Sequence, residues 1–192
     1  MKTFVLSIGV LAASLSACGD SNNTSTEVNK TADSTATTTA APNTTENQNA
    51  SVDEAVTAYL QLKNALTTDD GKEAAGAGKQ LHEAIVKLDN ASFAADQKKV
   101  YDDVKDDIKE HAEHISTNAE KIAHQREHFD MLSKDMVDLV KVVKPGQTLY
   151  IDHCPMYNDK KGADWLSEVK EIRNPYYGKK MPECGEVKEE IK

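Results

Sequence analysis

The sequence has few aromatic side chains, which limits the kind of core it can build. Only 5% of its 192 residues are Phe, Trp or Tyr, whereas 39% are hydrophobic. The core must therefore consist mainly of Val, Leu, Ile and Ala, and this aliphatic composition favours a bundle of helices.

Two classes of function lack their usual sequence signals. There is no glycine-rich phosphate loop, and no nucleophile stands at a recognisable spacing from a base and an orienting group. Positive charge is also scarce, since 23 Lys and Arg face 32 Asp and Glu for a formal charge of −9. Because nucleic-acid phosphates would be repelled, we expect no nucleic-acid partner and predict a binding protein rather than an enzyme.

Long hydrophobic runs are missing, and the one short run stands near the N-terminus. Residues 4–15 are mostly apolar, follow Lys2 and precede the small residues of Ser16-Ala17-Cys18. This pattern predicts a signal peptide over residues 1–18. L-S-A-C resembles the bacterial lipobox, so we expect Cys18 to carry a lipid anchor. The protein would then be a periplasmic or outer-membrane lipoprotein of the cell envelope, held to a membrane.

The next segment, residues 19–50, lacks aromatic side chains and is rich in Ser, Thr, Asn and Ala. Such a composition buries too little apolar surface to offset the entropy lost on ordering. We therefore expect a disordered tether that spans on the order of 30 Å. The folded domain is predicted over residues 51–192.

Four helical patterns follow the tether. Ser51 begins an S-x-x-E capping spacing, and Asp70 is placed to cap a second helix. A third helix follows the turn at residues 89–90, Thr117 begins another capping spacing for a fourth, and Pro145 ends it. Four amphipathic helices with short links predict an all-α fold, an antiparallel four-helix bundle.

Two glycines interrupt the pattern of the second helix. Gly76 and Gly78 each weaken a helix by about 1 kcal/mol relative to alanine. Since a glycine has no side chain, we expect these positions to let another helix approach closely.

The helical period is lost after Pro145, where residue types of unusual chemistry concentrate. Residues 150–186 hold the only Trp and two of the three cysteines. We expect an irregular C-terminal tail packed on the bundle. It would contain an extended piece at 149–151, about two helical turns over 165–172, and a frayed final turn over 186–192.

Sulfur side chains form two short motifs in this tail. Cys154 and Met156 make a C-x-M pair, Met181 and Cys184 make an M-x-x-C pair, and His153 precedes the first. Thiolate, thioether and imidazole groups prefer soft or borderline metals. We predict that these five side chains bind a metal, with copper as Cu(I) first and zinc second.

The same cysteines also permit a disulfide, because exported proteins occupy compartments in which disulfides persist. A bond between Cys154 and Cys184 would enclose about 30 residues and stabilise the fold by roughly 3 to 4 kcal/mol. The alternative function is therefore a disulfide-stapled structural or interaction module of the envelope that holds no metal.

Histidines gather where the third helix gives way to the fourth. His111 and His114 precede a tight turn expected at Thr117, and His124 and His128 follow it one helical turn apart. A composite site could form there, so His124 and His128 join the candidate metal ligands. The alternative is that these histidines are exposed and pair with neighbouring Glu and Asp residues.

Three further side chains are predicted to fasten the tail. The forked donors of Arg126 suit the tail's carbonyl oxygens or a carboxylate. Trp165 and Tyr176 or Tyr177 are expected to pack rather than to contact a ligand. The tail would then be clamped to the bundle by aromatic side chains.

Two blocks of sequence resemble a bacterial domain family of unknown function. The first, I-A-H-Q-R-E-H-F-D-M-L-S, covers residues 122–133, and the second, over residues 153–186, contains C-P-M, N-P-Y-Y-G and M-x-x-C-G in that order. The resembled family occurs on secreted lipoproteins and fused to periplasmic adaptor subunits of heavy-metal efflux pumps. The resemblance implies a helical envelope domain linked to copper handling, with metal-efflux components as partners.

These observations lead to one functional expectation. The chain is predicted to be a lipid-anchored envelope protein that binds a soft metal ion, Cu(I), as a buffer or chaperone in metal handling or efflux. By motif position, the resemblance points to the same four sulfur residues that the spacing selects, with His153 adjacent to them.

Overall fold

The computed structural model describes residues 44–91 and 93–192, with side chains from Val52 onward. The predicted signal peptide, the Cys18 anchor and residues 19–43 of the predicted tether lie outside this part of the chain. Within it, none of the helices combines the length and the apolar character that crossing a bilayer requires.

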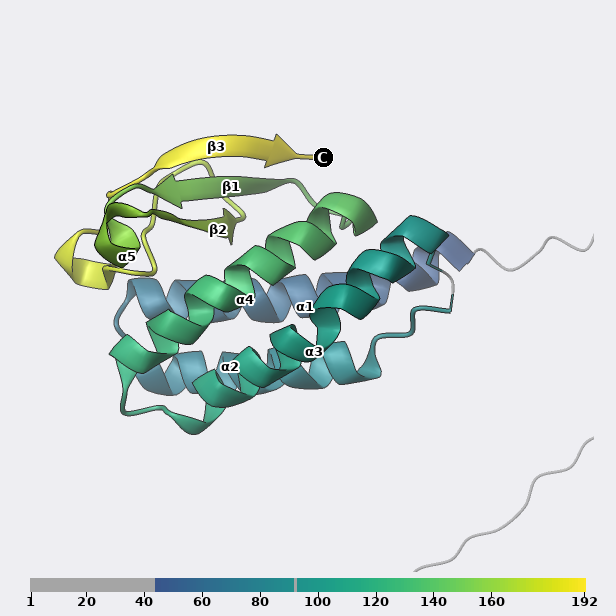
Figure 1. The fold of residues 1–192 in the computed structure, drawn as a ribbon, viewed down its shortest axis with the longest axis horizontal. Coiled ribbons are helices and arrows are strands. Elements are labelled where there is room, and N and C mark those ends of the chain that lie inside the picture. The colour runs from purple at the N-terminus through teal and green to yellow at the C-terminus, as the bar shows by residue number, and fades with distance from the viewer. Residues whose placement is uncertain (1–43, 92) are drawn as a thin grey trace, which may run out of the picture. The chain divides into compact units, whose positions relative to one another are not determined.

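Four long helices make up most of the domain, and they confirm the helical part of the sequence prediction (Figure 1). Their bounds are α1 Thr44–Thr67, α2 Gly71–Lys87, α3 Ala95–Thr117 and α4 Ile122–Val143. Each helix packs against the next one along the chain, as short links require. The helix α1 begins earlier than the Ser51 start expected from the sequence.

The helix ends show which capping signals are correct. The side chain of Asp70 accepts hydrogen bonds from the backbone N–H groups of Lys72 and Glu73 at 3.1 and 2.9 Å, which confirms the predicted cap of α2. Thr117 does not cap α4, since its hydroxyl donates to the carbonyls of Glu113 and His114 inside α3. A threonine at a helix C-terminus commonly bonds back to the preceding turn, so S/T-x-x-E spacing alone did not locate this boundary.

Gly78 allows α2 and α3 to pack closely. A Cβ atom at this position would lie 3.0 Å from the carbonyl oxygen of Ala112 and 3.0 Å from Cγ2 of Ile115. The expectation of a close approach is therefore confirmed for Gly78. It is wrong for Gly76, where an added Cβ would meet no atom within 4 Å.

The C-terminal part is a small sheet, so the all-α prediction is wrong there. Strands β1 (Leu149–Cys154), β2 (Ala163–Ser167) and β3 (Glu186–Ile191) pair antiparallel in the order β2-β1-β3. The extended piece expected at 149–151 is confirmed. The helical turns expected over 165–172 and 186–192 are wrong. Residues 165–167 and 186–191 pair with β1, and residues 168–171 form bends. Strand pairing of this kind is a long-range contact that no local pattern encodes.

Short turns complete the C-terminal part. Between β1 and β2 runs α5 (Tyr157–Lys160), in which Asn158 and Asp159 have positive φ angles of 51° and 55°. A 3-10 turn, η1 (Gly178–Lys180), precedes β3. The sheet lies alongside α4, which β2 contacts (Figure 1).

Buried polar contacts join α1 to the end of β2. Lys63 is fully buried, and its Nζ lies 2.8 Å from an oxygen of Glu168. The Tyr59 hydroxyl accepts from the backbone N–H of Leu166 at 3.1 Å and lies 2.7 Å from Oγ of Ser133 on α4. These contacts fix the sheet against two helices.

Arg126 joins α4 to the C-terminal part in the predicted way. Its Nε donates to the carbonyl of Pro175 at 2.8 Å, and its NH2 group donates to the carbonyl of Leu66 at 2.8 Å and to Asp69. The predicted packing role of the aromatic residues is confirmed for Trp165 and Tyr176, which are buried with ring centroids 5.9 Å apart.

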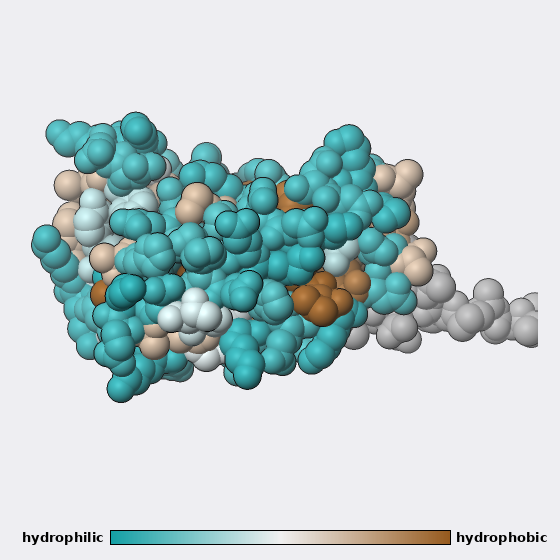
Figure 2. Space-filling model, turned by 60° about the horizontal axis from the view of Figure 1, so that its bottom comes forward, coloured by the Kyte–Doolittle hydropathy of each residue, from teal (hydrophilic) through white to brown (hydrophobic). Residues whose placement is uncertain are grey.

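The face drawn in Figure 2 is largely hydrophilic, with small separate apolar areas. The large hydrophobic side chains that are exposed in the described part of the chain come from separate elements: Val86, Met131, Met156, Val169 and Val187. Scattered apolar side chains of this kind are normal on a soluble domain. Clusters of reactive side chains are therefore stronger candidates for a functional site than an apolar docking face.

Candidate metal centres

The structure brings the two predicted cysteines together. Cys154 is the last residue of β1, and Cys184 stands two residues before β3. Their Sγ atoms lie 3.3 Å apart although the residues are 30 positions apart in the chain. Both are free thiols; Cys154 is buried and Cys184 is half-buried. The pairing of β3 with β1 is what places the two thiols side by side.

The separation of the sulfur atoms bears on what they can do. A disulfide requires about 2.05 Å between sulfurs. Two thiolates on one tetrahedral ion, each about 2.3 Å from it, lie about 3.8 Å apart. The observed 3.3 Å is closer to the second value. Burial and the neighbouring Cys154 thiol raise the pKa of Cys184, so metal binding here would release protons.

The two methionines flank this thiol pair. Met156 follows Cys154 by two residues, is exposed, and its carbonyl accepts a hydrogen bond from the Tyr177 hydroxyl at 3.0 Å. Met181 is half-buried, and its carbonyl accepts from the backbone N–H of Cys184 at 3.3 Å. The backbones of both methionines therefore lie near the thiols. That their thioether sulfurs bind an ion together with the thiols remains a prediction.

His153 is not brought to the thiol pair. Consecutive residues of a strand project to opposite faces of the sheet, so the His153 and Cys154 side chains diverge. Nδ1 of His153 lies 2.6 Å from Oδ1 of Asp164 on β2, and Lys188 on β3 contacts the other oxygen of Asp164 at 2.9 Å. The structure thus assigns His153 to a surface network of charged groups.

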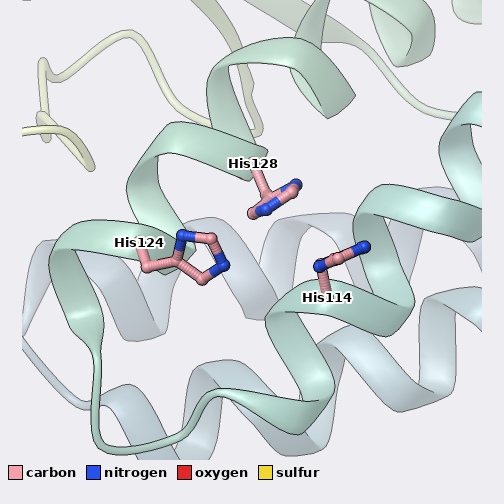
Figure 3. A group of neighbouring side chains, drawn as sticks. All are labelled: His114, His124 and His128. Carbon is pink, nitrogen blue, oxygen red and sulfur yellow. The ribbon is translucent and has the colours of Figure 1, made fainter.

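The predicted ligands His124 and His128 lie in a different place from the thiols, on the first two turns of α4. There they meet His114 from the last two turns of α3 (Figure 3). His111, one turn earlier on α3, lies beside His128. The turn between Thr117 and Ile122 reverses the chain, and this reversal brings the ends of the two helices together. The histidines therefore form one cluster on two consecutive helices.

The imidazole rings of this cluster are close-packed around His128. Its ring stacks on His114 with a centroid distance of 4.4 Å and lies edge-on to His124 at 4.5 Å. Nδ1 of His128 is 3.2 Å from Nδ1 of His111. One nitrogen from each of His114, His124 and His128 lies within 4.8 Å of the others. All three are within reach of a common ion after small ring movements.

Burial disfavours the protonated form of the inner rings of the cluster. Burial lowers the pKa of His111 against the opposing effect of Glu110 and Asp107. Burial, followed by the charges of the neighbouring histidines, lowers the pKa of His128. The expected pairing with carboxylates is also seen, since His124 lies 3.4 Å from Glu127. A neutral imidazole has a free lone pair, the form that a metal requires.

Sequence reasoning missed Asp152, which lies on β1 two residues before Cys154 and so on the same face of the sheet. Asp152 is fully buried opposite Trp165, and within the described part of the chain its oxygens and the indole Nε1 have no hydrogen-bond partner. Burial raises the pKa of Asp152 to about 7, against the effect of Lys63. No sequence signal marks this residue, because its burial results from strand pairing.

The fold and these side chains define a helical domain with a small antiparallel sheet and two groups of metal-ligating residue types. Part of it is shared with a known family: the family model for a protein of unknown function, DUF3347, matches residues 55–148. A DUF3347 domain is therefore present, and the matched residues include the histidine cluster and end before Cys154. No curated protein and no solved structure matches the chain.

Proposed function

We propose that this chain is a cell-envelope lipoprotein that binds Cu(I) through Cys154 and Cys184 and acts as a metal buffer or chaperone. The observation that carries the proposal is the 3.3 Å separation of two free thiols that are 30 positions apart. Two thiolates with nearby thioethers form a soft donor set, which suits Cu(I) better than harder ions. Zinc is the second ion that such thiols accept.

The surroundings of the thiols support a role in holding and passing on an ion. Cys154 is buried, so a bound ion would be shielded from water and oxidants on one side. Cys184 is half-buried and Met156 is 46% exposed, which leaves a route by which an ion can arrive and leave. Methionine needs no deprotonation to bind Cu(I), and Met156 and Met181 would complete the coordination.

The envelope location rests on the N-terminal sequence. The lipobox-like L-S-A-C predicts an acylated Cys18, and the tether would hold the domain clear of the membrane. The resemblance to domains fused to efflux adaptors makes metal-efflux components the proposed partners. Replacing Cys18 by Ser should release the protein from the membrane fraction, and continued membrane association would contradict the anchor.

A competition titration tests the metal proposal. The full chain carrying Cys18→Ser, so that only the two tail thiols remain, is titrated anaerobically with Cu(I) against a chelator of known affinity. We expect one equivalent to bind, and the further change of Cys154 and Cys184 to Ser to lower the affinity at least 100-fold. His124→Ala with His128→Ala is the matched control and should leave Cu(I) affinity unchanged. Unchanged affinity after loss of both thiols would contradict the assignment.

The second candidate function is a disulfide-stapled interaction module, which the same closeness of the thiols favours. Closing from 3.3 Å to a bond of about 2.05 Å requires only a small movement. The two candidate functions can be separated by counting the free thiols of protein isolated from the envelope without reductant. Two reactive thiols after denaturation and metal removal support the metal site, whereas no reactive thiols support the staple.

A further inference from the structure

We propose that His114, His124 and His128, with His111 beside His128, form a second metal centre, separate from the thiols, for a borderline divalent ion such as Zn²⁺ or Cu²⁺. This inference goes beyond the proposed function, which concerns Cu(I) held by sulfur. Imidazole is the preferred protein ligand for these divalent ions. The cluster and the thiol pair would then serve ions of different character in one small domain.

The distances between ring nitrogens are close to those that an ion requires. Two imidazoles on a tetrahedral Zn²⁺, each about 2.0 to 2.1 Å from it, have nitrogens about 3.3 to 3.4 Å apart. The Nδ1 atoms of His111 and His128 are already 3.2 Å apart. The nitrogens of His114, His124 and His128 lie within 4.8 Å of one another and need to approach by at most about 1.5 Å, which rotation about the side-chain torsions supplies.

The backbone that carries these rings is held firmly. Gln125, between His124 and His128, is buried and donates from Nε2 to the carbonyls of Gly71 at 2.9 Å and Ile115 at 3.1 Å. These bonds tie the start of α4 to the end of α3 and the start of α2. The ligand positions are therefore largely arranged before an ion arrives, which lowers the entropy lost on binding.

Carboxylates stand near two of the rings. Nδ1 of His124 is 3.4 Å from Glu127, and Nε2 of His114 is 4.0 Å from Glu110. The Glu127 carboxylate can accept a hydrogen bond from Nδ1 of His124, which fixes the tautomer of that ring and strengthens Nε2 as a metal ligand. Glu110 is too far from His114 for a hydrogen bond and contributes only its negative charge.

The arrangement of the rings around His128 also suits one shared ion. The ring centre of His128 lies 5.3, 4.4 and 4.5 Å from those of His111, His114 and His124. A single divalent ion satisfies several lone pairs at once. It would also bridge α3 and α4 and so stabilise the folded protein in proportion to its concentration.

Calorimetric titration of Zn²⁺ into the full chain with Cys18, Cys154 and Cys184 changed to Ser tests this centre without thiols. We expect one equivalent to bind and the unfolding temperature to rise. His128→Ala should lower Zn²⁺ affinity at least 50-fold, whereas His82→Ala, which removes a histidine on α2 outside the cluster, should not change it. His124→Ala, whose side chain is 38% exposed, gives the same test with less risk to folding and should lower affinity at least 10-fold.

Co²⁺ supplies a spectroscopic readout of the ligands. In the chain whose cysteines are changed to Ser, Co²⁺ at the histidine cluster should give ligand-field bands, and His128→Ala should abolish them. Zn²⁺ binding that vanishes with the thiols, or that His124→Ala and His128→Ala leave unchanged, would overturn the proposal. Failure of the Cu(I) titration with Zn²⁺ binding intact would instead refute only the proposed function.

Discussion

The histidine cluster and the thiol pair are built in opposite ways. The four histidines stand on two consecutive helices joined by a short turn, so their approach depends on local structure. The thiols are 30 positions apart, and their approach depends on a sheet that is itself held by contacts to α1 and α4. A site on adjacent helices can therefore survive changes that would disperse a site on paired strands.

The largest effect is expected where the sheet is fastened to α1. Lys63→Ala removes the buried partner of Glu168, whose own side chain is 33% exposed, and burial already lowers the pKa of this lysine. Loss of the ion pair and of the buried lysine stem should cost on the order of 3 kcal/mol in the free energy of unfolding, measured with urea. Lys98→Ala, which breaks an exposed pair with Asp102, is the control and should cost under about 1 kcal/mol. Equal losses would show that this pair does not anchor the sheet.

The next effect is a change in the pH dependence of stability at Asp152, beside the thiols. The pKa of Asp152 is about 7 in the folded chain, against 3.8 for an aspartate in an unfolded chain. Between these two pH values the folded chain keeps a proton that the unfolded chain releases. The stability that this proton contributes is present below about pH 4 and is lost as the pH rises through 7. Asp152→Asn should be the more stable form at pH 8, on the order of 3 kcal/mol, and should match the wild type at pH 4. An equal difference at both pH values would contradict the buried carboxyl.

Arg126 connects the two regions, because it lies between His124 and His128 on α4 but bonds to the C-terminal part. Arg126→Lys keeps the charge and loses the fork that reaches Pro175 and Leu66 together. We expect the free energy of unfolding to fall by about 2 kcal/mol, since hydrogen bonds from charged donors are among the stronger ones. Arg173→Lys, on an exposed arginine, should have little effect, and a similar loss there would show that the fork is unimportant.

The smallest effect concerns the packing of α3, which carries two of the histidines. Gly76→Ala should raise the free energy of unfolding by about 1 kcal/mol, because alanine favours helix and the site is open. Gly78→Ala should gain less or lose stability, since its Cβ would press on the backbone of Ala112. Equal gains in the two variants, measured by urea unfolding, would refute the close approach of α2 and α3.

The helices were predictable because their signals are local. Apolar periodicity located all four helices. The predictions that Asp70 caps α2 and that Arg126 binds a carbonyl of the tail were also confirmed. The sheet was not predictable in this way. Residues 165–172 have a helix-compatible pattern, and only the edge of β1 makes Ala163–Ser167 a strand.

The same division applies to the candidate ligands. Helical spacing indicated that His124 and His128 could meet His111 and His114, and the structure joins these four. Motif spacing also selected Cys154 and Cys184 as neighbours. The same spacing wrongly grouped His153 with the two cysteines. Adjacent residues of a strand project to opposite faces of the sheet, but the sequence alone did not show that residues 149–154 form a strand.

The most direct test of the account is X-ray absorption at the copper edge on the full chain loaded anaerobically with one equivalent of Cu(I). We predict a first shell of sulfur atoms at about 2.3 Å, as expected for thiolates on a soft ion, and its loss when Cys154 and Cys184 become Ser. A first shell of nitrogen and oxygen alone in the unaltered chain would contradict a sulfur site for copper.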